Sequence, residues 1–205
     1  MSQANTSTRP LPDEALSRLI AGNKRYIAGF DSPDSFKFQD PAIKNQQHPY
    51  ACILGCADSR VSPEHTFDES HGNLFVTRVA GNFVTPEILA SLEYGTAVLG
   101  ASVILVLGHS GCGAVNAAMK AVESKAIFPG HIGQLIDQLT PSVEQVRHDD
   151  HEHWQREAVI QNVATNVSIL KSSEPILKKR IEDGLLKVVG GVYNLESGEV
   201  SIIEN

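Results

Sequence analysis

Four short apolar segments alternate with longer amphipathic ones along most of this chain. The four are rich in valine, isoleucine and leucine, and the first three show no strict alternation of apolar and polar positions. Such runs are typical of strands buried on both faces of a parallel sheet. The predicted strands span Tyr50–Leu54, Leu74–Val79, Val103–Leu107 and Lys187–Tyr193.

Apolar residues recur at helical spacing between and beside these strands. The predicted helices are one that begins at Pro10–Asp13, followed by Thr85–Leu99, Ala114–Ser124, Gly130–Val146, Glu157–Ser172 and Pro175–Asp183. Val200–Ile203 can add an antiparallel edge strand through a turn at Glu196-Ser197-Gly198. We therefore predict an α/β fold of three layers, a mainly parallel sheet of about four core strands flanked by helices.

The N-terminal quarter of the chain differs in character. Gly29–Pro49 is polar and proline-containing, and predicts an irregular arm with a short helix at Pro41–Asn45. A free loop of this length is uncommon inside a compact domain, so we expect the arm to pack on a partner. Residues 1–49 then form an N-terminal helix and arm on the neighbouring subunit, and residues 50–205 form the α/β domain of what is a single domain overall.

Composition narrows the class of protein. The 205 residues include 17 Lys+Arg and 24 Asp+Glu, which gives a net charge of −7 and argues against nucleic-acid and membrane partners. The apolar run Ala97–Leu107 is about half of the ~20 residues that a membrane span needs. Met1–Thr8 is polar and has no apolar signal core. Three cysteines cannot form a closed disulfide framework, so we expect a cytoplasmic protein with free thiols.

Reactive side chains follow two of the predicted strands. Cys56 and Asp58 come directly after the first, and His109 and Cys112 directly after the third. In parallel sheets such strand ends share one edge. Two thiolates and one imidazole with an open position suit catalytic zinc, and Asp58 is the obvious fourth ligand of a closed site. Spacing alone leaves two readings open, a metal centre or separately buried residues.

The same segments, Cys56-Ala57-Asp58-Ser59-Arg60 and His109-Ser110-Gly111-Cys112, resemble the signature of the β-class carbonic anhydrases. The similarity covers most of the chain. It extends to Leu16-x-x-Leu19-x-x-Gly22-Asn23-x-Arg25-Tyr26, Gln47-x-Pro49, Phe75-Val76-x-Arg78-x-Ala80-Gly81-Asn82, Ser91-x-Glu93-Tyr94 and Gly190-Gly191-x-Tyr193.

This resemblance implies reversible hydration of carbon dioxide to bicarbonate and a proton, by attack of zinc-bound hydroxide. It implies that Cys56, His109 and Cys112 bind one Zn2+ per subunit. Asp58, paired with Arg60 as a catalytic dyad, then either accepts a hydrogen bond from the nucleophile or closes the site as a fourth ligand.

The resemblance also implies a substrate pocket of the plant-like, open-site subclass. Gln47 and the N–H of Gly113 would donate to substrate oxygens, and Phe75 and Tyr94 would form apolar walls, with Tyr94 reaching across a dimer interface. Ile53 stands where the bicarbonate-inhibited subclass has tryptophan. Although Arg78, another residue of that inhibitory pocket, is present, we expect an open zinc site and no tryptophan-dependent bicarbonate pocket.

Family members form homodimers or dimers of dimers, which we expect here. Two other functions share the same residues, hydrolysis of carbonyl sulfide or carbon disulfide and a non-catalytic zinc-binding scaffold. We interpret Cys52 as a buried structural thiol. His148–His153 reads as a solvated acidic turn, and Trp154 as a core or interface residue.

Overall fold

The structure is a computed structural model that describes residues 9–29 and 47–203. The short helix expected at Pro41–Asn45, and most of the arm around it, lie outside these residues. The rest of the expected architecture can be compared element by element.

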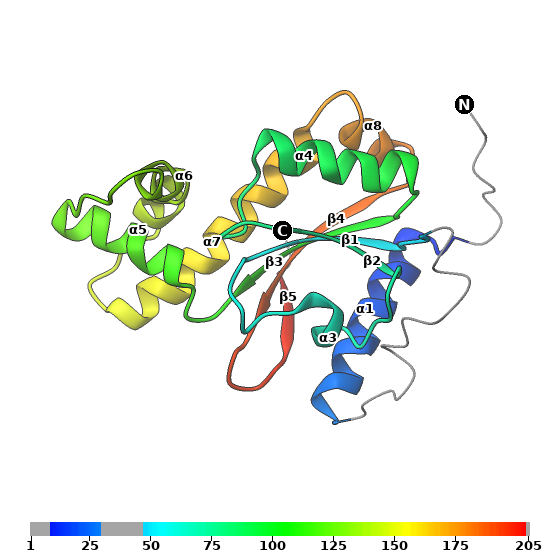
Figure 1. The fold of residues 1–205 in the computed structure, drawn as a ribbon, viewed down its shortest axis with the longest axis horizontal. Coiled ribbons are helices and arrows are strands. Elements are labelled where there is room, and N and C mark those ends of the chain that lie inside the picture. The colour runs from blue at the N-terminus through cyan, green and yellow to red at the C-terminus, as the bar shows by residue number, and fades with distance from the viewer. Residues whose placement is uncertain (1–8, 30–46, 204–205) are drawn as a thin grey trace.

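The sheet has five strands in the order β2-β1-β3-β4-β5 (Figure 1). β1 (Ala51–Gly55), β2 (Leu74–Arg78), β3 (Val103–His109) and β4 (Lys187–Tyr193) run parallel. β5 (Val200–Ile203) pairs antiparallel with β4 at the edge. The predicted fold, four parallel core strands with an antiparallel edge strand, is therefore confirmed.

Helices cover both faces of this sheet (Figure 1). α4 (Pro86–Glu93), α7 (His151–Ser172) and α8 (Leu177–Glu182) lie on one face, and α1 (Pro12–Ile27) and the four-residue α3 (Pro63–Thr66) lie on the other. α5 (Gly113–Ser124) and α6 (Ile132–Gln145) project beyond the end of the sheet and pack on α7.

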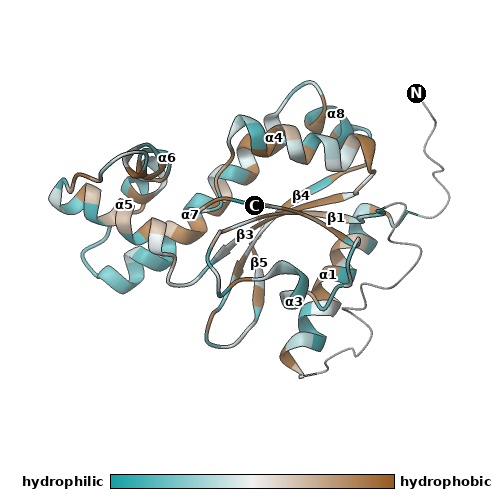
Figure 2. Ribbon diagram, viewed as in Figure 1, coloured by the Kyte–Doolittle hydropathy of each residue, from teal (hydrophilic) through white to brown (hydrophobic). Residues whose placement is uncertain are grey.

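Alternate residues of the central strands supply two separate cores. Ile53 and Leu105 pack with Leu19 of α1, while Leu54 and Ile104 pack on the opposite face with α4, α7 and α8. Because both faces are covered, every residue of β1 and β3 is buried, and Figure 2 shows hydrophobic colour along these strands. This double burial explains the unbroken apolar runs in the sequence.

Two of the predicted helices differ most from the structure. α7 begins at His151, six residues earlier than expected, because the Asp150 carboxylate accepts a hydrogen bond from the His153 N–H (2.9 Å) and caps the helix. The expected helix Thr85–Leu99 is α4 followed by a π-helix, η1 (Tyr94–Val98).

The π-helix coincides with a close approach to β1. A Cβ on Gly95 would lie 2.5 Å from the Cys52 sulfur, so only glycine allows η1 to pack so near the sheet.

α1 is fixed to its own chain by a buried asparagine. The Asn23 amide donates to the carbonyls of Thr66 (3.0 Å) and Gly198 (2.9 Å), and its oxygen accepts from the Val200 N–H (2.9 Å). α1 therefore joins the α3 loop to the β4–β5 hairpin within one subunit. Its contact with a neighbouring subunit remains an expectation. Across the described ranges, no helix has both the length and the apolar character needed to cross a bilayer.

Candidate metal centre and active site

Three candidate ligands meet where β1 and β3 end. Cys56 directly follows β1, His109 is the last residue of β3, and Cys112 immediately precedes α5. β1 and β3 are adjacent and parallel, so their ends share one edge of the sheet. The ligand atoms of the three residues all lie within 4.8 Å of one another, and all three residues are buried. The structure thus brings together side chains that are more than fifty positions apart in sequence.

The histidine is oriented as a ligand. Its Nδ1 lies 2.9 Å from the Ser110 carbonyl oxygen, which can only accept, so Nδ1 carries the proton. Nε2 is then a bare acceptor, and this buried atom has no hydrogen-bond partner among the described residues. A buried acceptor without a donor is costly unless a cation or another group satisfies it. Two cysteines and one such imidazole form a donor set that fits zinc.

The two thiols also affect each other's ionisation. The hydrogen bond from Cys112 lowers the pKa of the Cys56 thiol, and that same Cys56 thiolate raises the pKa of Cys112. Ionisation of one thiol therefore opposes ionisation of the other, and a cation bound between the two sulfurs would remove this opposition. Because backbone N–H groups of Ala114 and Val115 at the start of α5 act in the opposite direction on Cys112, they favour its thiolate.

Asp58 lies beside this cluster and is held by Arg60. Arg60 donates from Nε to Oδ1 (2.9 Å), from Nη2 to Oδ2 (2.7 Å) and from its backbone N–H to Oδ1 (3.0 Å). These hydrogen bonds hold the pKa of the Asp58 carboxyl well below its usual range. Oδ2 is 3.8 Å from His109 Nε2, so the carboxylate borders the ligand cluster while its oxygens are engaged by the guanidinium.

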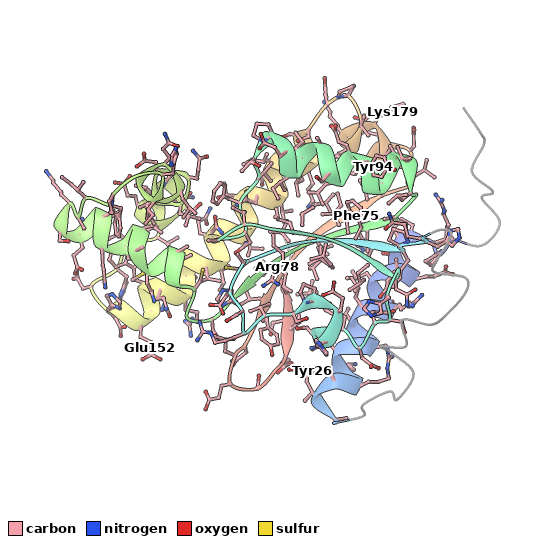
Figure 3. The ribbon with its side chains drawn as sticks, in the orientation of Figure 1. Tyr26, Phe75, Arg78, Tyr94, Glu152 and Lys179 are labelled. Carbon is pink, nitrogen blue, oxygen red and sulfur yellow. The ribbon has the colours of Figure 1, made fainter. Side chains whose placement is uncertain are left out.

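Arg78 supports the backbone that carries Cys56 and Asp58. It donates from Nε to the Cys56 carbonyl (2.8 Å), and from Nη2 to the carbonyls of Asp58 (2.7 Å) and Val61 (2.9 Å). Figure 3 labels it where β2 ends. From the sequence, Arg78 was considered only as a residue of an inhibitory pocket. Its supporting role could not be predicted, because it depends on contacts that no local sequence pattern shows.

The four residues that we expect to line the substrate pocket have different surroundings in the structure. Phe75 and Tyr94 form a ring pair with centroids 6.3 Å apart (Figure 3), and Tyr94 is 49% exposed. Gly113 is exposed, and a Cβ built on it would meet nothing within 4 Å. Gln47 is exposed and directly follows residues 30–46, which the structure does not describe.

Residues given no role in the site have ordinary structural positions. Ile53 is fully buried in the core between the sheet and α1. Cys52 is fully buried as well, and burial raises the pKa of its thiol to about 12. Trp154 is a core residue that donates from Nε1 to the Val143 carbonyl (2.9 Å).

The expected acidic turn at His148–His153 is only partly correct. Its second half forms the first residues of α7, because Asp150 caps the helix there.

One contact to the site was missed in the sequence. The backbone N–H of Gly81 lies 3.3 Å from the Cys56 sulfur and donates to it. Gly81 belongs to the Arg78-x-Ala80-Gly81-Asn82 motif, so the sequence marked this residue, but it did not show that the N–H of Gly81 points at Cys56.

The chain is similar to known proteins over nearly all of its length. The family model described as carbonic anhydrase matches residues 51–200. "Carbonic anhydrase 2" of Mycobacterium tuberculosis is 37% identical over 91% of this chain and 90% of its own. A Coccomyxa β-carbonic anhydrase solved with acetazolamide has a TM-score of 0.72 at 28% identity, over 92% of this chain and 86% of that one.

A tetrameric β-carbonic anhydrase of Sordaria macrospora, 24% identical, shares the fold with a TM-score of 0.73 over 80% of this chain and 85% of its own. The family match, the identity to the mycobacterial enzyme and the Cys-His-Cys cluster agree with one another. The chain belongs to the β-class carbonic anhydrases.

Proposed function

We propose that this carbonic anhydrase interconverts carbon dioxide and bicarbonate at an open zinc site that the Asp58–Arg60 pair keeps open. One observation carries the proposal. Both carboxylate oxygens of Asp58 are bonded by Arg60 while one of them borders the three ligands at 3.8 Å from His109 Nε2. A carboxylate held in this way is poised to accept a hydrogen bond and is restrained from becoming a fourth ligand.

Zinc held by Cys56, His109 and Cys112 would supply Lewis-acid activation of water at near-neutral pH. The chain's own residues do the rest. Asp58 accepts a hydrogen bond from the attacking oxygen, which leaves a lone pair of that oxygen directed at the substrate carbon. Because its pKa is lowered, Asp58 stays an acceptor throughout the working pH range.

Substrate is held by donors and by apolar surface. Gly113 begins α5, so its N–H has no partner within the helix and can donate to a substrate oxygen. Gln47 would supply a second donor. Phe75 and Tyr94 supply apolar surface that suits carbon dioxide and excludes water.

The proposed unit is a homodimer or a dimer of dimers, located in the cytoplasm. Tyr94 and Val98 are 49% and 56% exposed, which leaves large apolar side chains of η1 open to solvent in the isolated chain. A second subunit that covers them would bury this apolar surface and complete the pocket. The tetrameric Sordaria enzyme, which shares the fold, is consistent with such an assembly.

The alternative activity, hydrolysis of carbonyl sulfide or carbon disulfide, is not favoured, because the curated relatives are named as carbonic anhydrases. A non-catalytic scaffold is disfavoured by the presence of the Asp58–Arg60 pair.

Stopped-flow hydration of carbon dioxide tests the function on protein with a quantified zinc content. We expect activity to scale with bound zinc, to disappear with a chelator and to return on zinc addition. A parallel assay with carbonyl sulfide separates the two activities, and preferential turnover of carbonyl sulfide would contradict the proposal.

A further inference from the structure

A tight backbone turn at Gly81–Asn82 touches the proposed metal centre. The two residues have φ values of +88° and +42°. This turn points the Gly81 N–H at the Cys56 sulfur, 3.3 Å away. A Cβ on Gly81 would lie 2.8 Å from Leu139 Cδ1, so both the backbone angle and the packing require glycine. The turn therefore presents one buried donor to one proposed ligand.

The turn is held from the other side by α7. Asn162 donates from Nδ2 to the Gly81 carbonyl at 2.8 Å. Asn162 is 2% exposed, so this bond forms away from water and competes with few alternatives. Its side-chain oxygen accepts from Asn166 Nδ2 at 3.1 Å. Every polar atom of the Asn162 side chain thus faces the turn or its helical neighbour.

Asn166 provides an internal comparison. It lies one helical turn after Asn162, is 3% exposed, and accepts a hydrogen bond from the Val84 N–H at 2.7 Å. Both asparagines dock the same loop onto α7. Asn162 alone bonds the residue that donates to the Cys56 sulfur.

We propose that Asn162 is a positioning residue for the metal centre: by fixing Gly81, it holds the N–H that bonds the Cys56 thiolate. The proposal rests on the zinc site of the proposed function. A hydrogen bond to a thiolate withdraws electron density that the sulfur would otherwise donate to a metal. Two thiolates already neutralise the charge of a zinc ion, so a donor on one of them preserves Lewis acidity. Asn162 reaches the metal through Gly81 and does not touch the substrate.

A purely structural role for Asn162 predicts something different. If the side chain served only to dock α7, its loss would lower stability and leave the electronic properties of the bound metal unchanged. The Asn166→Leu variant measures that effect. It removes the partner of the Val84 N–H and the 3.1 Å bond to the Asn162 oxygen, but it leaves in place the Asn162 amide that donates to the Gly81 carbonyl.

The test compares wild type, Asn162→Leu and Asn166→Leu, each loaded with cobalt in place of zinc. Leucine resembles asparagine in shape and removes the hydrogen bonds. We expect the sulfur-to-cobalt charge-transfer band of Asn162→Leu to shift to longer wavelength, because a thiolate without its N–H donor releases electron density more easily. We also expect zinc affinity, measured by competition with a chromophoric chelator, to fall about 10- to 100-fold, because the turn that orients the Cys56 ligand is no longer fixed to α7. Asn166→Leu should lose a similar amount of stability and keep the wild-type band.

The experiment distinguishes failure of the proposed Asn162 role from failure of the zinc site. Identical bands and zinc affinities in the two variants would overturn the proposal. Failure of wild-type protein to bind either metal would instead overturn the zinc site itself. If Asn162→Leu does not fold, cadmium-113-loaded wild type labelled with 15N-glycine tests the hydrogen bond directly. A scalar coupling between cadmium and the Gly81 N–H supports the proposal, and its absence contradicts it.

Discussion

The Arg60 guanidinium donates hydrogen bonds to both carboxylate oxygens of Asp58, at 2.9 Å and 2.7 Å, although the two residues are only two positions apart. The backbone turns here, because the Val61 N–H donates to the Asp58 carbonyl at 3.1 Å, and the turn brings the Arg60 side chain back onto the Asp58 carboxylate. The geometry is bidentate, which fixes the direction of the carboxylate as well as its charge. Asp58 is thereby held beside the three ligands as an acceptor.

Replacement of Asp58 by alanine should separate catalysis from metal binding. We expect Asp58→Ala to keep its zinc, because the three ligands are elsewhere, and to lose turnover by about 100-fold or more. Zinc analysis and stopped-flow hydration on the same sample measure the two effects. Asp149→Ala, which removes an exposed carboxylate outside the site, is the control. Full activity in Asp58→Ala would remove the residue from the mechanism.

Loss of Arg60 should close the site. In Arg60→Gln the carboxylate loses its bidentate partner, so we expect Asp58 to become free to bind the metal. X-ray absorption on zinc-loaded variant should then show an additional protein oxygen near zinc, together with a loss of activity. A wild-type coordination environment in Arg60→Gln would show that the ion pair does not control the fourth position.

Activity should rise toward mildly alkaline pH. Two thiolates neutralise the charge of zinc, so the metal acidifies water less than it does with three neutral histidines. The low pKa of Asp58 places its protonation below the range of the assay, so this carboxylate does not produce the rise. A hydration-rate profile from pH 6 to 9, at constant ionic strength, checks the expectation. A profile that is flat, or that falls above neutrality, would contradict it.

Much of this site could be predicted because its chemistry lies at strand ends. Cys56 and His109 flank apolar runs, and parallel strands must end at one edge, so their meeting followed from the fold class. The contacts of Gly81 and Asn162 could not be predicted, because they join residues 81 positions apart through one backbone turn. The π-helix at Tyr94–Val98 likewise depends on tertiary packing against Cys52, which propensity does not encode. The start of α7 was missed because its cap, Asp150, lies within a run of acidic residues and histidines.

Zinc removal should make two of the three cysteines reactive toward an alkylating reagent and leave the third unreactive. Cys52 is fully buried with a thiol pKa raised to about 12, so it stays protonated and unreactive near pH 8. Cys56 and Cys112 should be protected by the metal and become reactive after chelation. Alkylation followed by peptide mass spectrometry tests this. We expect labelling of Cys56 and Cys112 only after chelator treatment, and of Cys52 only after unfolding. Rapid labelling of Cys52 in the folded protein would contradict its assignment to the core.

Complementation between inactive variants tests whether one site uses residues from two subunits. If the arm of one subunit places Gln47 in the site of its partner, Gln47→Ala and Asp58→Ala damage different halves of that site. Subunit exchange between the two inactive variants would then produce mixed dimers in which one site has both residues intact. We expect activity to reappear after mixing under conditions that allow exchange, and to stay absent in mixtures that are assayed before exchange. No recovery, with exchange confirmed by mass spectrometry, would place Gln47 and Asp58 in the same subunit's site, as would active monomers on dilution.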